Sequence, residues 1–493
     1  MKRFQTKFTL FSTLFILLIL GLAGCQSAPE PEPTATAIPP TPIPTNTLAP
    51  TATSTPVPTA TPTDLPPTEQ NTPAVVAPST PLPDEYVILG ELPLGLPPIM
   101  AENVQAMRSL LTVENEGAFD VVFSPTADSF AQVFTDWIWV YRLDENHMFG
   151  SYLVQGQRPV FSPNGRYLAT TTGDNNITLY DVYSGAEIGV MRQHTDFLTS
   201  YAFSRDSRWL ASSALDGQLI LWDASTASAS AVINVTEILP DGPWVDMVYF
   251  GPNGELAAFS GEASTMMFTT LAELLAGSGK PRLVSWTDFA GPGSQAFLSP
   301  EWDALMWVAR ATLVFMNPVT TEIYGEFSHE DFLSDPLFAP DGQVFFRTSQ
   351  AVGETFVGVF VVYDYRTGDR VNTLPHNDFP ATAVLSPGGD TLAAADFSNV
   401  VRLWNVSDGQ LRTEFATGEF GVSSLLYSSD GSLLMTLDNA ATFHGYDART
   451  GTELYVDTSE SGNNLLFADW LKGDSLLATI DADGDVQLWG VAP

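Results

Sequence analysis

The sequence predicts an all-β fold, a β-propeller of four-stranded antiparallel blades, and three observations support this prediction. A nine-residue phrase, FSPNGRYLA at 161–169, returns in related form along the chain at intervals of 38 to 48 residues. Two further short apolar runs follow each copy and end in turn signals, so each repeat holds strands rather than helices. Those runs are almost continuously apolar, as in sheets packed on both faces. Small sheets that stack on one another in this way close into a ring.

Residues 1–24 have the layout of an export signal. A basic opening, MKRFQTK, leads into an apolar run over 8–22 that is too short to span a bilayer comfortably. The next residues, Leu22-Ala23-Gly24-Cys25, resemble the lipobox of bacterial lipoproteins. The resemblance implies cleavage before Cys25 and acylation of its sulfur, so the chain is expected to be exported and held on the membrane of a bacterial cell envelope. An ordinary secretory signal with a chance cysteine is the alternative.

Residues 25–85 are predicted to form a disordered linker behind the lipidated cysteine. Positions 26–83 contain 17 Pro and 14 Thr among 58 residues and no aromatic residue. Such a composition cannot bury enough apolar surface to offset chain entropy and favours extended polyproline conformation. The segment therefore acts as a tether, followed by a short lead-in segment at 86–104 and the propeller at 105–493.

The repeated phrase marks the first turn of each predicted blade. Its first residue recurs nine times, at Phe123, Phe161, Phe203, Phe250, Leu298, Phe338, Leu385, Tyr427 and Trp470. Ser-Pro and Asn/Asp-Gly make the turn after the first strand, and a later turn carries Gly four residues after Asp or Asn, as at Asp181–Gly185 and Asp447–Gly451. Nine blades are predicted. Seven or eight remain possible because the fourth and fifth copies are degenerate.

The last copy stops at its third strand, in VQLWGVAP, so its fourth strand must come from elsewhere. The segment at 105–113, QAMRSLLTV, is the only uncommitted candidate. If it adds to the last blade, both ends of the propeller lie in one sheet and no sheet edge stays open.

The chain resembles the Trp-Asp (WD) repeat family of β-propellers over about residues 105–493. Trp222-Asp223 is the literal dipeptide, and His194, His329 and His376 each lie nine residues before their repeat's first residue. In this family the histidine, a strand hydroxyl, a turn Asp and the Trp form a buried hydrogen-bond network. The resemblance implies a full set only in the third copy, formed by His194, Ser212 or Ser213, Asp216 and Trp222.

The sequence contains no complete motif for catalysis, metal binding or cofactor binding, so no catalytic residue, metal site or cofactor is predicted. Asp481-Ala482-Asp483-Gly484-Asp485 begins like a calcium loop but has Val486 in place of Gly and no Glu at position twelve, so it is interpreted as a turn. His147 and His444 show no partner pattern in the sequence. Two departures from a regular blade are noted: a capping box at Thr270–Glu273 for a helix to Leu275, and extra residues within 349–358 that are expected to lengthen a loop.

The formal charge of −37 disfavours binding to nucleic acid or direct docking on anionic lipid. The leading hypothesis is therefore a membrane-anchored, non-catalytic platform for protein partners. Its binding role is inferred by analogy with the family, because fold alone does not fix function. A glycan or small-molecule receptor on one propeller face is the alternative, and an enzyme with its site in the central channel is the third possibility.

Overall fold

A computed structural model describes residues 87–493 except 94, 115–117, 119, 144–147, 174, 240–243, 261–264, 278–279, 286–294, 310–311, 319, 321, 329–335, 353–354, 377, 419–420, 439–441, 458–464, 482–483 and 492–493. The predicted signal peptide, Cys25 and the linker lie outside the described residues. Among the residues that are described, no helix is both long enough and apolar enough to cross a bilayer.

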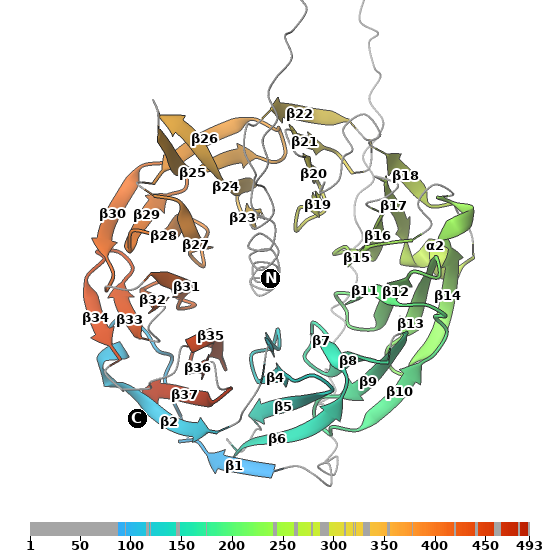
Figure 1. Cartoon of the computed structure of the whole chain (residues 1–493), viewed down its shortest axis with the longest axis horizontal. Helices are drawn as coiled ribbons and strands as arrows, with labels where there is room; N and C mark the ends of the chain where they lie inside the picture. Colours follow the sequence, from blue (N-terminus) through green and yellow to red (C-terminus); the bar gives the residue numbers. More distant parts are fainter. Residues whose placement is uncertain are drawn as a thin grey trace, which may run out of the picture. The chain divides into compact units, whose positions relative to one another are not determined.

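Nine antiparallel sheets lie around a common axis, so the propeller prediction and the count of nine blades are confirmed (Figure 1). Within a blade the strands run from a, next to the axis, to d, at the rim.

Blade 1 is built from β3 (Asp120–Phe123), β4 (Ser129–Val133), β5 (Trp137–Leu143) and β6 (Met148–Gln155). Blade 2 is built from β7 (Gln157–Phe161), β8 (Tyr167–Thr172), β9 (Asn176–Asp181) and β10 (Glu187–Met191). Blade 3 is built from β11 (Leu198–Phe203), β12 (Trp209–Ala214), β13 (Gln218–Asp223) and β14 (Ser228–Asn234). Blades 4 to 6 are built from β15 (Met247–Phe250), β16 (Glu255–Ser260), β17 (Thr265–Thr270) and β18 (Arg282–Ser285); β19 (Gln295–Leu298), β20 (Leu305–Ala309), β21 (Thr312–Met316) and β22 (Ile323–Ser328); β23 (Leu337–Phe338), β24 (Gln343–Val352), β25 (Thr355–Asp364) and β26 (Arg370–Pro375). Blades 7 to 9 are built from β27 (Pro380–Leu385), β28 (Thr391–Asp396), β29 (Val400–Asn405) and β30 (Leu411–Ala416); β31 (Val422–Tyr427), β32 (Leu433–Asp438), β33 (Phe443–Asp447) and β34 (Glu453–Val456); β35 (Leu465–Leu471), β36 (Leu476–Asp481) and β37 (Val486–Val491). A short 3₁₀ turn, η2 (Val235–Glu237), follows blade 3.

Each end of the ring carries its own set of connections. The turns from strand a to b and from c to d lie at one end, which we name the a–b end. The turns from b to c and the loops that link one blade to the next lie at the other, the b–c end, because the strands of a blade are antiparallel.

The structure of the a–b turn explains why the nine-residue phrase recurs. In blade 3 the Ser204 hydroxyl accepts a hydrogen bond from the backbone N–H of Trp209 at 2.9 Å and donates to the Asp206 carboxylate at 2.5 Å. Ser428 and Asp430 repeat this pattern in blade 8. One serine thus closes the turn and orients the acidic residue two positions later, which is why Ser and Asn/Asp recur at this spacing.

The core is divided among the interfaces between blades. Clusters of buried apolar side chains join every pair of neighbouring blades in the described part of the chain. The last of them packs Phe130 and Tyr141 of blade 1 against Leu488 of blade 9 and so closes the ring. Both faces of the inner strands are therefore covered, which explains their continuous apolar sequence.

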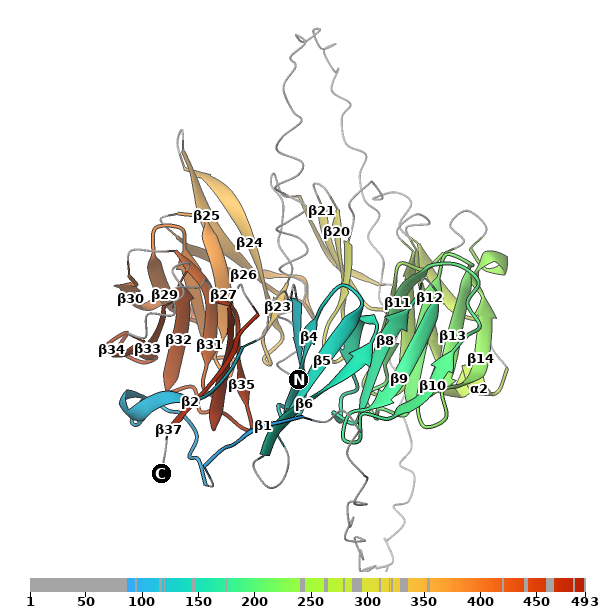
Figure 2. The same cartoon turned by 60° about the horizontal axis from the view of Figure 1, so that its bottom comes forward.

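The N-terminal part of the described chain fastens this closure. β2 (Met107–Val113) pairs antiparallel with β37 and is the fourth strand of blade 9, the place the sequence predicts for residues 105–113. β1 (Val87–Glu91), which the sequence did not reveal, adds a fifth strand to the rim of blade 1 by pairing with β6. Figure 2 shows β1 and β2 on neighbouring blades.

Between these two strands the chain crosses the a–b end as a strap, which we define as residues 92–93 and 95–106. It includes the 3₁₀ turn η1 (Val104–Ala106). The Ile99 N–H donates to the carbonyl of Asp474 in blade 9, and the Ala101 N–H donates to the hydroxyl of Ser432 in blade 8. Ile99 and Val104 are fully buried among side chains of blades 8 and 9. The strap therefore joins three consecutive blades.

Both departures from a regular blade are visible. Thr270 caps α2 (Leu271–Leu275): its hydroxyl accepts from the Glu273 N–H while the Glu273 carboxylate accepts from the Thr270 N–H, so the predicted capping box is confirmed. The expectation that the extra residues within 349–358 lengthen a loop is wrong. They extend β24 and β25 to ten residues each, paired from Gln343↔Asp364 to Val352↔Thr355, and this hairpin stands above its neighbours at the b–c end (Figure 2).

Candidate interaction face

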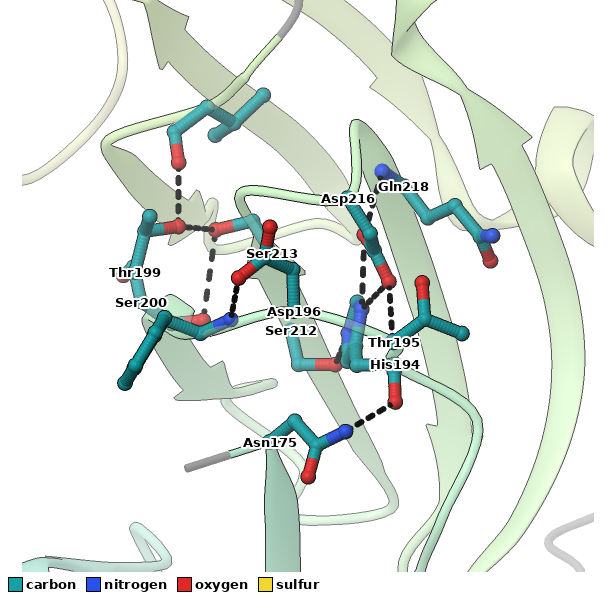
Figure 3. Close-up of polar contacts among 12 residues, drawn as sticks. Asn175, His194, Thr195, Asp196, Thr199, Ser200, Ser212, Ser213, Asp216 and Gln218 are labelled. Atoms are coloured by element: carbon teal, nitrogen blue, oxygen red, sulfur yellow. Dashed lines mark hydrogen bonds and ion pairs between the residues drawn. The ribbon is translucent and has the colours of Figure 1, made fainter.

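His194, Ser212 and Asp216 of the predicted network in blade 3 lie together (Figure 3). His194 Nδ1 lies 3.0 and 3.2 Å from the two carboxylate oxygens of Asp216, and its Nε2 lies 2.8 Å from the Ser212 hydroxyl. The Trp222 indole N–H donates to the same hydroxyl at 2.8 Å. Of the two serines that the sequence left open, Ser212 makes these contacts, whereas Ser213 bonds to Thr199 on strand a.

The electrostatics of this network are those of a structural element. The side chains of His194 and Asp216 are 1% and 3% exposed. Burial lowers the pKa of His194 below its ordinary value, although the Asp216 carboxylate acts in the opposite direction. A neutral ring with the proton on Nδ1 donates to Asp216 and accepts the Ser212 hydroxyl proton at Nε2. No atom is left over for a substrate.

Asp216 also fixes the loops around it. Its carboxylate accepts the backbone N–H groups of Thr195 at 2.8 Å and Gln218 at 2.9 Å. It thereby ties the inter-blade loop at 192–197 to the b–c turn at 215–217. The network holds the b–c end of blade 3 in one conformation.

Blade 7 has a corresponding buried network that is built from different residues. Ala394 stands where blade 3 has Ser212, and the Trp404 indole N–H donates directly to His376 Nε2 at 3.3 Å. Arg402 bonds to the fully buried Asp396 and, at 3.1 Å, to Glu414. Burial, and next the Arg402 charge, lower the pKa of His376 to about 4.

Among the three remaining histidines, only His444 lies in the described part of the chain. His444, for which the sequence shows no partner pattern, has a partner in the structure: its Nδ1 lies 2.8 Å from the Glu453 carboxylate on the neighbouring strand. A contact between residues nine positions apart on paired strands leaves no motif in the sequence. His147 and His329 lie outside the described residues.

Nothing among the described side chains gathers the ligands of a metal ion. The segment interpreted from the sequence as a turn connects β36, which ends at Asp481, to β37, which begins at Val486. The Asp481 carboxylate accepts the Asp485 N–H at 2.9 Å and the Gly484 N–H bonds to the Asp481 carbonyl, while residues 482–483 lie outside the described part of the chain.

Exposed apolar side chains mark the b–c end instead. Phe197 is 56% exposed and Leu215 42%, in adjacent loops of blade 3. Phe379 and Phe397 occupy the corresponding loops of blade 7, at 38% and 65%. The loops are tied in the same way, because the Leu215 N–H donates to the Phe197 carbonyl and the Phe397 N–H to the Phe379 carbonyl. We name these four residues the apolar pairs.

The sequence held a signal for these residues that the repeat analysis missed. His-x-Asp-Phe occurs at 194–197, 329–332 and 376–379, always six residues from Phe to the first residue of the repeated phrase. Three histidines at one spacing drew attention to the buried network, while the phenylalanine three positions later is the exposed residue.

The fold and these contacts define a β-propeller with network-stabilised loops at one end. Residues 150–181 and 185–223 match the family model described as "WD domain, G-beta repeat". Each match runs through strand d of one blade and strands a to c of the next. The chain is thus a WD-repeat β-propeller.

Other proteins are similar to this chain over longer stretches. The guanine nucleotide-binding protein subunit beta of Zea mays is 23% identical over 310 residues, which cover 58% of this chain and 68% of the relative. Autophagy-related protein 16 of Arabidopsis thaliana is 25% identical over 152 residues, 30% of each chain. Among solved structures, a eukaryotic initiation factor aligns with a TM-score of 0.52 at 12% identity over 69% of this chain and 88% of that one. The C-terminal WD40 domain of Sif2 aligns with a TM-score of 0.47 at 12% identity, over 79% and 99%.

Proposed function

We propose that this protein is a membrane-anchored bacterial lipoprotein whose propeller binds protein partners at its b–c end and has no catalytic activity. WD-repeat propellers are in general platforms for protein–protein interaction, which supports the class of partner. The observation that carries the proposal is the recurrence of the apolar pairs on blades 3 and 7. The loops that carry them are held by hydrogen bonds to each other and by the buried histidine networks.

Exposed apolar groups rimmed by polar residues are typical of interaction sites, whereas singly scattered ones are normal on any surface. Phe197 and Phe379 recur at the same position of two blades, and each is joined by a second apolar residue. Asp196 and Asp378 stand beside them. Aromatic side chains contribute much of the binding energy at protein interfaces.

The alternative functions have less support. A glycan receptor needs Trp or Tyr rings in one groove. The most exposed rings of these types in the described residues are Trp137, the first residue of β5 at the b–c end, and Tyr183, in the c–d turn of blade 2, so they lie at opposite ends of the ring. An enzyme needs titratable groups that converge in an open site, and the described histidine networks are buried.

Site-specific photocrosslinking on intact cells tests the platform. A photoreactive phenylalanine analogue replaces Phe397 in one strain and Tyr183, 41% exposed at the a–b end, in a control strain. A discrete crosslinked protein is expected from position 397 and not from 183. Equal patterns from both positions, or none from 397, would contradict the proposal.

The anchor and the location outside the cytoplasm rest on residues 1–25 alone. Acylation of Cys25 would attach two or more fatty-acid chains, enough for a stable anchor where a single chain would be marginal. Labelling with a palmitate analogue is expected in wild type and absent in Cys25→Ala. Equal labelling of the two proteins would rule out this anchor.

A further inference from the structure

We infer that the partner presents a cationic segment, rich in Lys or Arg and carrying apolar side chains, to the b–c end. This inference rests on the proposed function and gives it a partner chemistry. It follows from what surrounds the apolar pairs.

The two phenylalanines that recur each carry a carboxylate next to them. The Asp196 carboxylate accepts the Phe197 N–H at 2.8 Å, and the Asp378 carboxylate accepts the Phe379 N–H at 2.7 Å. One carboxylate oxygen is used in this way, and both aspartates are exposed. Each loop therefore offers an aromatic ring and a negative charge together.

The same dipeptide continues around the ring in sequence. Phenylalanine follows an acidic residue at eight places in the sequence. Five of them lie between the last strand of one blade and the first of the next, at 196–197, 288–289, 331–332, 378–379 and 419–420; the other three, at 326–327, 396–397 and 414–415, lie within or at the end of a strand. Five of the inter-blade connections thus carry an acidic-aromatic pair, although only two of them fall within the described residues.

Three arginines near this end bond to groups of the chain itself, and Arg158 is the exposed one among them. Arg158 of blade 2 donates to the carbonyls of Leu198 and Thr199. Arg347 of blade 6 makes the corresponding contacts in blade 7, with Pro380 and Ala381, and its guanidinium lies 5.5 Å from the Phe379 ring centre. Arg402 is buried against Asp396.

The exposed charges at the two ends differ accordingly. In the described b–c turns and inter-blade loops, exposed carboxylates outnumber exposed cations; the carboxylates are Glu114, Asp136, Asp196, Glu237 and Asp378, and the cation is Arg192. The described turns of the a–b end expose more cations, seven in all, beside nine carboxylates; the cations are Arg166, Arg205, Arg208, Lys280, Arg366, Arg449 and Lys472, and the carboxylates are Asp206, Glu273, Glu301, Glu322, Asp341, Asp369, Asp390, Asp408 and Asp430. A partner that packs on the apolar pairs must approach through a negative field, which favours a cationic one.

Selection from a random dodecapeptide phage library tests this chemistry even though the partner is unidentified. The exported chain from residue 26 onward is immobilised as wild type and as Phe197→Ser/Phe379→Ser. Peptides recovered on wild type are expected to be enriched in Lys or Arg together with apolar residues, and the Ser variant is expected to lose them.

The charge contribution is then measured on the recovered peptides by fluorescence anisotropy. Asp196→Asn/Asp378→Asn keeps the carbonyl oxygen that accepts the Phe N–H and removes only the charge. Binding is expected to weaken by about tenfold, as two exposed charge pairs would give. Asp408→Asn, an exposed turn carboxylate at the a–b end, is the matched control and should change nothing. The difference should largely vanish in about 1 M NaCl, where the Debye length is about 3 Å.

The outcomes separate the two proposals. Neutral or acidic peptides that still require Phe197 and Phe379 would overturn the cationic partner and leave the interaction face standing. Cationic peptides unaffected by the Asn variant would do the same. Recovery of no peptides, or of peptides that bind the Ser variant equally, would overturn both.

Discussion

Ser212→Ala is the sharpest perturbation of the network that holds the b–c end of blade 3. The Ser212 hydroxyl accepts from the Trp222 indole N–H and donates to His194 Nε2, each at 2.8 Å, and it is fully buried. The substitution leaves one buried donor and one buried acceptor unpaired, and each costs about 1–3 kcal/mol.

Blade 7 shows how far relaxation can offset this loss. There an alanine, Ala394, faces the network, and Trp404 donates directly to His376 at 3.3 Å. If blade 3 adopts this arrangement, the two groups regain a longer bond to each other. We therefore expect a loss of about 2 kcal/mol in the free energy of unfolding.

Urea unfolding followed by tryptophan fluorescence measures this loss, with Ser228→Ala on the exposed edge strand of the same blade as the control. The midpoint should fall with the slope unchanged. The reverse substitution, Ala394→Ser, supplies blade 7 with the missing hydroxyl and should not destabilise. A loss below about 0.5 kcal/mol for Ser212→Ala, no greater than that of an ordinary surface substitution, would refute the reasoning.

Three further predictions concern pH, closure and capping. The pKa of His376 is about 4 in the folded chain, below the ordinary 6.5. Below pH 6.5 the unfolded chain therefore takes up a proton at position 376 that the folded chain does not. The free energy of unfolding is unaffected by this group above pH 6.5 and falls by up to about 3 kcal/mol as the pH drops to 4. His376→Gln should flatten this dependence in urea titrations across that range, and an unchanged slope would contradict it. Ile99→Ala, at a fully buried position of the strap, should cost about 2–5 kcal/mol, whereas the exposed Arg108→Ala on β2 should cost little; similar midpoints for the two would show that the strap does not fasten the ring. Thr270→Ala removes the cap of α2 and should cost about 1 kcal/mol, while Thr270→Ser should restore it; equal losses from both would exclude the capping box as the cause.

The architecture could be predicted because it depends on local, repeated requirements. Ser204 and Asp206 close a turn within a few residues, and the same need recurs in other blades, so the spacing is legible without an alignment. Asp216 and Trp222 could be assigned through the resemblance to WD repeats, which left Ser212 and Ser213 as alternatives for the hydroxyl. The Thr270 capping box is equally local.

Contacts between blades or between distant strands were not predictable. β1 pairs with β6 from more than fifty residues away, and its five-residue sequence has no counterpart in the repeat. The His444–Glu453 pair and the Arg402–Asp396 pair depend on strand register, which no spacing rule encodes. The exposure of Phe197 was missed because an aromatic residue beside a strand is more often buried, and only the shape of the loop turns it outward.

The position of β1 has a mechanical consequence. It is attached by one edge to β6, whereas β2, which closes the ring, comes later in the chain. Tension applied through the segment before Val87 would reach β1 first and could peel it away pair by pair. Loss of the β1–β6 pairing would lengthen the chain before the strap, while the β2–β37 pairing that closes the ring stayed intact and the loops of the b–c end kept their conformation.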